Sequence, residues 1–213
     1  MLPQLNHLME NKVVLYGASG HAKVIIDILL SNHVTIDSII DDNPKSPTIL
    51  GKSVTKTSAF DLNSLQNTII AIGNNQIRKK LSKELQTTFF TAVHPSAVVS
   101  AFSQIGEGSV LMANSVINPE VVIGKHCIIN TGAILEHDCH IGDFAHISPA
   151  VSLAGNVTIG EGAHVGIGAT IIQGIVVGKW ATVGAGSVII RDVPDYAVVV
   201  GNPGKVIKYN KEK

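Results

Sequence analysis

The sequence predicts a small α/β unit followed by a triangular β-helix. Two patterns predict this order. Apolar runs that end at glycine or acidic turns occupy the first third of the chain, and an aliphatic residue recurs at every sixth position over the following half. The composition agrees, because aromatic residues make up only 4% of the chain and β-branched residues suit stacked strands.

The first third contains three expected strands, at residues 12–16, 37–40 and 68–72, and two expected helices, at residues 24–30 and 77–85. The first strand ends in a turn that holds Ser19, Gly20 and His21, the second in Asp41 and Asp42, and the third in Gly73 and Asn74. The carboxyl ends of parallel strands meet at one edge, and a helix N-terminus there favours phosphate. We therefore expect a Rossmann-like unit with a ligand along that edge.

The glycine pattern also limits the ligand. Lys23 stands where the third glycine of the dinucleotide fingerprint would be, which disfavours an NAD enzyme and favours a single nucleotide or a nucleotide-sugar. A second interpretation stays open, in which Gly17 and Gly20 only form turns.

The hexad pattern begins at Val93, and every sixth residue from there to Ile189 is Val, Ile or Leu. The position four residues later in each hexad is small or β-branched, and Ile175 is its one bulky member. One aliphatic and one small inward residue per hexad predict three faces and coils of about 18 residues. Cys127 and Cys139 occupy the small inward position, so we interpret them as core residues. Glycine follows the aliphatic residue in many hexads, as a tight corner requires.

These patterns divide the chain into four parts. An N-terminal extension covers residues 1–11, the nucleotide-sugar-binding unit residues 12–92, the β-helix residues 93–194 and a C-terminal tail residues 195–213. Equal numbers of basic and acidic residues give no indication of nucleic acid, and no apolar run is long enough for a membrane span. Without a signal-peptide pattern or a cysteine framework, we expect a cytoplasmic protein.

The combination of both patterns resembles the sialic acid O-acetyltransferase family of bacterial sugar acyltransferases. The resemblance is strongest at residues 130–139 (NTGAILEHDC), at residues 144–147 (FAHI) and at residues 154–157 (AGNV). Within the family, the chain looks most like the N-acetyltransferases that act on nucleotide-linked 4-amino-sugars. The resemblance implies a left-handed β-helix, acetyl-CoA as acyl donor without a metal, and a homotrimer.

The resemblance also implies roles for particular residues. His137 matches the general base and Asp138 the carboxylate that raises its basicity. Acetyl-CoA contacts are implied for His146, Gly155, Ile167 and Ala185, the last of which is often glycine in relatives. Sugar-nucleotide contacts are implied for Ser19, Gly20, His21, Asp41, Asp42, Gly73 and Asn74.

The residues themselves support part of this reading. Acyl transfer to an amine needs a base, and His137 stands outside the two inward positions of its hexad. His146 is also outward, and we interpret His126, His140 and His164 as surface residues and Trp180 as an isolated exposed aromatic that could instead stack on adenine.

Four alternatives remain open. Sialic acid O-acetylation and a dTDP-linked amino-sugar substrate stay within the family. A γ-type carbonic anhydrase would use His137, His140 and His146 as zinc ligands, although their spacing differs from that of such enzymes. An inert scaffold would not explain the nucleotide-like first third.

Overall fold

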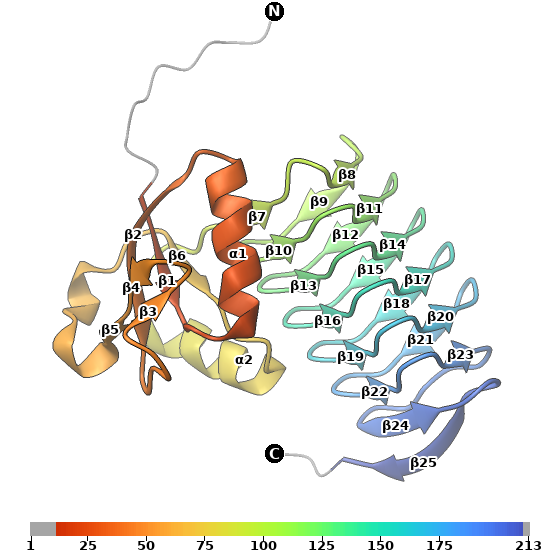
Figure 1. Cartoon of the computed structure of the whole chain (residues 1–213). Coiled ribbons are helices and arrows are strands. Elements are labelled where there is room, and N and C mark those ends of the chain that lie inside the picture. The colour runs from red at the N-terminus through yellow and green to blue at the C-terminus, as the bar shows by residue number, and fades with distance from the viewer. Residues whose placement is uncertain (1–11, 211–213) are drawn as a thin grey trace, which may run out of the picture.

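The computed structural model describes residues 12–210, and the predicted N-terminal extension lies outside this range (Figure 1). An α/β unit stands beside a long β-helix, and the C-terminal strands close the far end of that helix. The predicted architecture of an α/β unit followed by hexapeptide coils is confirmed. None of the helices between residues 12 and 210 has the length and apolar character needed to cross a bilayer.

The α/β unit is built on a parallel sheet in the order β5-β2-β1-β6. Its strands are β1 (Lys12–Tyr16), β2 (Thr35–Asp41), β5 (Thr55–Lys56) and β6 (Thr68–Ile70), and its helices are α1 (Gly20–Ser31) and α2 (Asn75–Glu84). β1 lies in the middle because its apolar run is buried on both faces. The chain continues to β2 on one side of β1 and to β6 on the other, so the sheet has a topological switch point at β1.

Shorter elements connect β2 with β6. A hairpin of β3 (Thr48–Ile49) and β4 (Lys52–Ser53) precedes β5, and two short 3₁₀ turns follow it, η1 (Thr57–Ala59) and η2 (Leu62–Ser64). The sequence pattern gives no indication of these elements or of β5.

The β-helix has three parallel faces whose paired residues are 18 positions apart, as in Leu111 with Ile129 and Ile147 with Val165. The face toward the α/β unit holds β7 (Ala92–Val93), β10 (Val110–Leu111), β13 (Ile128–Ile129), β16 (His146–Ile147), β19 (His164–Val165), β22 (Thr182–Val183), β24 (Ala197–Val200) and the antiparallel β25 (Lys205–Tyr209). We call it the eight-stranded face.

The two other faces are named in the same way. The six-stranded face holds β8 (Val98–Val99), β11 (Val116–Ile117), β14 (Ile134–Leu135), β17 (Ser152–Leu153), β20 (Thr170–Ile171) and β23 (Val188–Ile189). The five-stranded face holds β9 (Gln104–Ile105), β12 (Val122–Ile123), β15 (His140–Ile141), β18 (Thr158–Ile159) and β21 (Val176–Val177).

The predicted inward positions form the core of this helix. From Leu111 to Ile189 the aliphatic position of every hexad is buried, and Cys127 and Cys139 are buried with it. Burial raises the pKa of the Cys127 thiol to about 12, so this thiol stays protonated and unreactive. The interpretation of both cysteines as core residues is confirmed.

The glycines at the corners of the β-helix have a different role from the one expected. From Gly108 to Gly186, the residue three positions after the aliphatic one has a positive φ, whether it is glycine or a residue such as Asp138 or Trp180. The glycines directly after the aliphatic residue are needed for close approach instead. A Cβ on Gly106 would lie 2.5 Å from the carbonyl carbon of Gly124 in the next coil.

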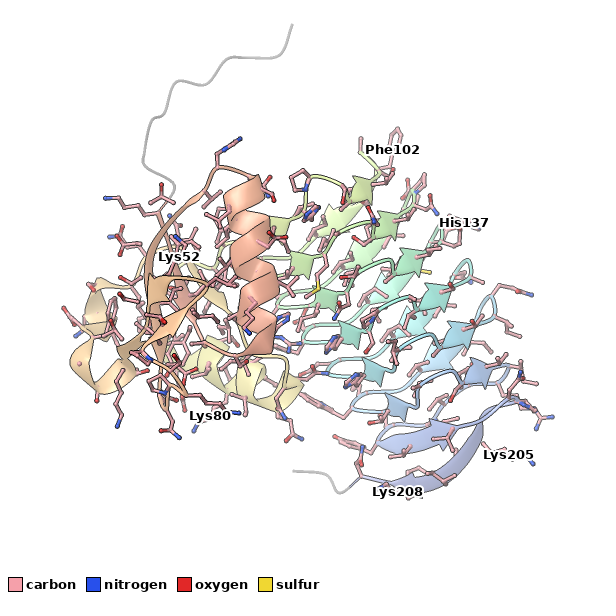
Figure 2. The ribbon with its side chains drawn as sticks, in the orientation of Figure 1. Lys52, Lys80, Phe102, His137, Lys205 and Lys208 are labelled. Atoms are coloured by element: carbon pink, nitrogen blue, oxygen red, sulfur yellow. The ribbon has the colours of Figure 1, made fainter. Side chains whose placement is uncertain are left out.

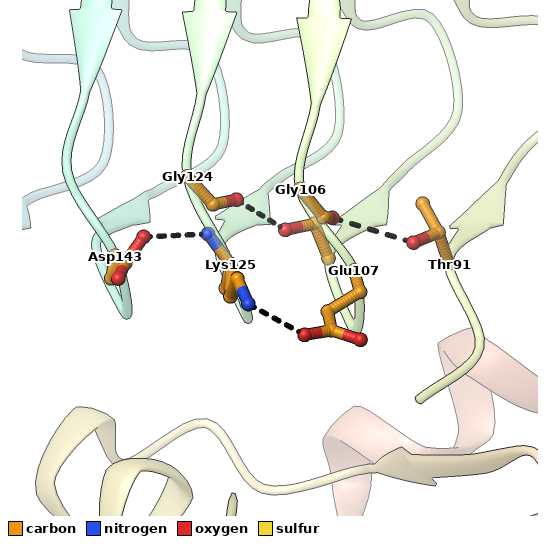
Figure 3. A network of polar contacts seen from close by, with 7 residues as sticks. Thr91, Gly106, Glu107, Gly124, Lys125 and Asp143 are labelled. Carbon is orange, nitrogen blue, oxygen red and sulfur yellow. Dashed lines mark hydrogen bonds and ion pairs between the residues drawn. The ribbon is translucent and has the colours of Figure 1, made fainter. Parts of the chain in front are cut away.

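Polar side chains tie successive corners together on the side that faces the α/β unit. Asp143 accepts a hydrogen bond from the backbone N–H of Lys125 at 2.8 Å, and the Lys125 ammonium pairs with Glu107 at 2.8 Å (Figure 3). Asp195 accepts a bond from the Lys179 N–H in the same way, at 2.7 Å. These contacts satisfy corner N–H groups, and the exposed ion pair adds little stability of its own.

One apolar cluster joins the two parts of the molecule. It contains β1 and α1 residues such as Leu15 and Ile25 together with Val110, Met112 and Ile128 of the eight-stranded face. The α/β unit therefore has a fixed place on that face.

Candidate active site

The turn after β1 is held by the acidic residues after β2. Asp41 accepts hydrogen bonds from the backbone N–H groups of Ala18 at 2.7 Å and of Asn43 at 2.8 Å. Asp42 accepts a bond from the Tyr16 hydroxyl at 2.7 Å, and burial together with this carboxylate raises the pKa of Tyr16 to about 12. Both carboxylates thus shape the turn that ends β1.

The first turn of α1 presents N–H groups without a side-chain cap. Ser19 is the N-cap residue but makes no capping bond, and the space beside Gly20 is open. Such a turn favours an anion. His21 is largely buried, and burial and the Arg78 charge lower its pKa to about 4, so its ring is neutral at neutral pH.

The loop after β6 completes the edge. The Asn74 side chain accepts a bond from the Ile77 N–H at 3.0 Å and caps α2, and Gly73 precedes it. Because β1, β2 and β6 are adjacent and parallel, the residues predicted to contact a sugar-nucleotide gather at one edge. These residues are Ser19, Gly20, His21, Asp41, Asp42, Gly73 and Asn74.

His137 and Asp138 stand at the corner between the six-stranded and five-stranded faces, away from the α/β unit (Figure 2). The His137 Nδ1 lies 2.7 Å from a carboxylate oxygen of Asp138, and this hydrogen bond raises the pKa of His137. The histidine side chain is 64% exposed in the single chain. Its Nε2 is thus the ring nitrogen left to take a proton from a substrate.

Gly155 lies beneath the His137 ring, one coil further along. A Cβ at Gly155 would lie 2.6 Å from His137 Cε1 and 2.8 Å from Nε2. The absence of a side chain therefore lets the imidazole rest on the next coil.

His146 is on the eight-stranded face, covered by the α/β unit. Its Nε2 lies 3.1 Å from Asn130 Nδ2, and its ring stacks on His164 with centroids 4.7 Å apart. Burial lowers the pKa of His146 to about 3, with smaller contributions from the charges of His164, Arg78 and His21. Its Nδ1 is buried without a hydrogen-bond partner within residues 12–210.

A pocket of about 550 Å³ opens between the start of α2 and the eight-stranded face. Two aromatic rings and several uncharged hydrogen-bonding groups form its wall, a composition that suits a neutral polar ring such as a sugar or a base. The lining residues are Gly73, Asn74, Asn75, Gln76, Gly162, His164, Trp180, Thr182, Tyr196 and Asn210.

The expectations for two outward residues were wrong. Trp180 is not an isolated surface aromatic, because it packs on Gly162, lies 5.2 Å from the Lys79 ammonium and forms part of the pocket wall. His126 is only 3% exposed, since it stacks on Phe144 and meets the edge of Phe89. The α/β unit covers both positions, and the hexad pattern contains no signal for that cover.

His140 and His164, also expected at the surface, differ in their surroundings. His140 is exposed, as expected. His164 has an accessible surface but lies inside the pocket, where reduced hydration and Arg78 lower its pKa. His137 and His146 lie on different sides of the β-helix, and no three His, Cys, Asp or Glu side chains among residues 12–210 are placed to hold a metal ion. The zinc cluster that a γ-type carbonic anhydrase requires is not formed by these residues.

Ile167 and Ala185, both expected to contact acetyl-CoA, lie on a third side. They follow β19 and β22 at the corner between the eight-stranded and six-stranded faces, and Ile167 is 56% exposed. The structure thus brings Ile167 together with Ala185, and Gly155 together with His137, on two different corners.

Comparison with known proteins matches both parts of the chain. Residues 12–85 match the PglD N-terminal domain, residues 102–137 the bacterial transferase hexapeptide and residues 156–191 the hexapeptide repeat of succinyl-transferase. A curated relative, UDP-N-acetylbacillosamine N-acetyltransferase from Bacillus subtilis, is 42% identical over 118 residues. That alignment covers 49% of the chain and 52% of the relative, so the chain spans about half the length of this curated relative.

Solved structures match over almost the whole chain. Perosamine N-acetyltransferase from Caulobacter crescentus, in complex with CoA and GDP-perosamine, is 39% identical with a TM-score of 0.88, covering 92% of this chain and 97% of that one. The acetyltransferase domain of PglB from Neisseria gonorrhoeae, in complex with acetyl coenzyme A, is 35% identical with a TM-score of 0.85, covering 93% and 100%. These similarities confirm the predicted left-handed β-helix.

Proposed function

The chain belongs to the bacterial sugar N-acetyltransferases that combine a PglD N-terminal domain with hexapeptide repeats, and from this premise we propose that it acetylates the 4-amino group of a nucleotide-linked amino-sugar, with acetyl-CoA as donor. The observation that carries the proposal is the His137–Asp138 pair, 2.7 Å apart at an exposed corner of the β-helix. The relatives that bind CoA or a nucleotide-linked sugar support it.

In this proposal the sugar amine attacks the thioester carbonyl directly. The C–N bond forms as the amine proton moves to Nε2 of His137, and the C–S bond then breaks, with the proton passing to the leaving thiolate of CoA. Asp138 stabilises the imidazolium, and the backbone N–H of Gly155 donates to the developing oxyanion. His146, Ile167 and Ala185 hold the acetyl-CoA.

The edge of the α/β sheet takes the nucleotide-sugar. The uncapped first turn of α1 at Ser19 and Gly20 suits the diphosphate, and the turns at Asp41–Asp42 and Gly73–Asn74 flank it. A UDP-linked 4-amino-sugar is the substrate we favour. The GDP-linked sugar of one structural relative, a dTDP-linked sugar and the hydroxyl of a sialic acid are the competitors.

We further propose a homotrimer with its sites between chains. A pantetheine arm needs a groove with two walls, and the two corners that carry the expected acetyl-CoA contacts lie on different sides of a single β-helix. Closed cyclic symmetry is also common among homo-oligomers. Three β-helices side by side would bring the corner of His137 and Gly155 against the corner of Ile167 and Ala185 in the next chain.

A substrate panel tests the activity. Release of CoA from acetyl-CoA is measured with UDP-, GDP- and dTDP-linked 4-amino-sugars, and with their 4-hydroxy counterparts and sialic acid. We expect turnover with an amino-sugar, and a His137→Ala variant that loses about 10²–10⁴-fold in kcat while its affinity for the nucleotide-sugar is kept. Turnover of hydroxy-sugars alone would reject N-acetylation, and full kcat in His137→Ala would reject the base.

A further inference from the structure

Arg78 is a charged residue of α2 that the proposed chemistry leaves without a role. Its side chain is 1% exposed, and burial lowers its pKa to about 10, so it still carries its charge at neutral pH. The guanidinium makes five hydrogen bonds, all to neutral oxygens and all between 2.8 and 3.2 Å. The acceptors are the carbonyl oxygens of His126, Phe144, Ile72 and Gly73 and the side-chain oxygen of Asn75.

Two of these acceptors are corner carbonyls of the β-helix. His126 and Phe144 hold the same corner position in consecutive coils, with φ of 53° and 61°. Their N–H groups bond to the preceding coil, to the carbonyl oxygens of Glu107 and Lys125. The α/β unit covers their carbonyl oxygens, and a buried carbonyl needs a donor. Arg78 supplies it at 2.8 Å to each.

Asn75 continues the same row in the third coil. Its side-chain N–H₂ donates to the carbonyl oxygens of Gly162 at 3.0 Å and Ala163 at 3.3 Å, while its oxygen accepts the bond from Arg78. Corner residues 126, 144 and 162 are thus contacted in sequence by two side chains from the start of α2.

The remaining bonds of Arg78 go to the loop after β6. Its Nη1 donates to the carbonyl oxygens of Ile72 at 3.1 Å and Gly73 at 3.2 Å. One planar group therefore binds the loop that carries Gly73 and Asn74 and, at the same time, the corners of the β-helix. Lysine could not do both, because it is a point donor without the guanidinium fork.

We propose that Arg78, together with Asn75, is a positioning residue that fixes the loop of residues 72–75 against the β-helix, so that the sugar-nucleotide held by the α/β unit meets the acetyl group at the correct distance. This inference rests on the proposed function, since it assumes that Gly73 and Asn74 contact the nucleotide-sugar. Arg78 itself touches no substrate.

The test compares Arg78→Lys with the wild-type protein at a temperature well below the thermal midpoint of both. We expect kcat/KM for the nucleotide-sugar to fall about tenfold or more, because small misplacements of bound reactants are costly in catalysis, while KM for acetyl-CoA changes less than about twofold. Lys80→Met is the matched control on the same helix, since Lys80 is 71% exposed and pairs only loosely with Glu84. It should leave kcat/KM for the nucleotide-sugar and KM for acetyl-CoA unchanged.

A folded Arg78→Lys with a lower thermal midpoint but an unchanged kcat/KM for the nucleotide-sugar would overturn the proposal and leave Arg78 a purely stabilising residue. If Arg78→Lys does not fold, Asn75→Ala removes the donor to Gly162 and Ala163 while keeping α2 intact. Because Asn75 also lines the pocket, its effect is compared with that of Gln76→Ala, a neighbouring residue of the same pocket wall. Wild-type turnover of the amino-sugar is measured first. If the wild-type protein does not turn over the amino-sugar, the proposed function is rejected. If it does, and the variants have the same kinetic constants as the wild type, only the positioning role is rejected.

Discussion

At the scale of single residues, the histidines differ in what surrounds each ring. Asp138 raises the pKa of His137 at an exposed corner, whereas burial and the Arg78 charge lower the pKa of His21, to about 4, and of His146, to about 3. At neutral pH the buried rings are therefore neutral hydrogen-bonding groups. His137 combines an accessible nitrogen with a carboxylate that stabilises the protonated ring, which is the combination a general base needs.

The pH dependence of kcat tests this pair. The base form of His137 is lost as the pH falls through its pKa, so the acidic limb of the kcat–pH profile lies at that pKa. Asp138→Asn removes the anion that raises the pKa, and the acidic limb should move to lower pH, with a fall of about tenfold or more in maximal kcat.

Glu136→Gln is the matched control. Glu136 is also a nearby carboxylate, but it contributes least to the raised pKa of His137 and makes no hydrogen bond to the ring in the structure. Its removal should move the acidic limb less than Asp138→Asn does. An unmoved limb in Asp138→Asn would contradict the role of that carboxylate.

The sequence predicted the exposure of some residues and missed the burial of others for a physical reason. His137 and Asp138 are neighbours in the chain, and their outward position follows from the hexad period alone. Arg78, Trp180 and the burial of His126 depend on how the α/β unit lies on the β-helix, which no local pattern encodes. A charged residue in an otherwise amphipathic helix gave no sign that it would be buried.

At the scale of elements, the coils need glycine for two different reasons. Gly142 has an ordinary φ, but a Cβ there would lie 2.6 Å from the backbone nitrogen of Glu161 in the next coil. Gly174 has a φ of 71°, and its Cβ would meet only open space. Gly142 is constrained by the close approach of the next coil, whereas Gly174 is constrained by a positive φ that residues with a side chain rarely adopt.

These two reasons predict different costs. Gly142→Ala should lower the free energy of unfolding by about 2 kcal/mol or more, because two coils must separate, and Gly174→Ala by about 1 kcal/mol. Urea unfolding of both variants measures the difference. Equal losses, or a larger loss for Gly174→Ala, would show that the positive φ is the stronger constraint.

The accuracy of the element predictions follows the strength of each pattern. The strand at residues 12–16 and the whole series of coils match, because a buried run and a six-residue period are long-range signals. The hairpin of β3 and β4 and the edge strand β5 are two-residue strands, too short to show any period. The helix α1 begins at Gly20, earlier than the apolar stretch indicated, because its first turn forms part of the glycine turn.

At the scale of the whole molecule, the residues of the proposed site lie on different sides of a single chain. The edge of the α/β sheet lies beside the eight-stranded face, where the pocket joins Gly73 and Asn74 to His164, the stacking partner of His146. His137 stands on the corner away from the α/β unit (Figure 2). The proposed function would take His137 from one chain and His146 with the α/β unit from its neighbour, which is the arrangement that the proposed trimer provides.

Mixed trimers test this division. His137→Ala and His146→Ala proteins, each of low activity, are dissociated, mixed in equal amounts and reassembled. In a cyclic trimer each site takes one histidine from each of two neighbours, so random mixing should restore about a quarter of the sites to the wild-type pair. Activity near that level, with the wild-type KM for both substrates, is the expected result.

The control is a mixture in which each chain carries both substitutions or neither. Its sites have the wild-type pair only where two unsubstituted chains meet, again in about a quarter of cases, so it sets the activity expected for that fraction of intact sites. If both histidines served one site from the same chain, the single-variant mixture would stay inactive while half the sites of the control would be intact. An active monomer by light scattering would reject the trimer itself, because His137 would then work without the face of a neighbour.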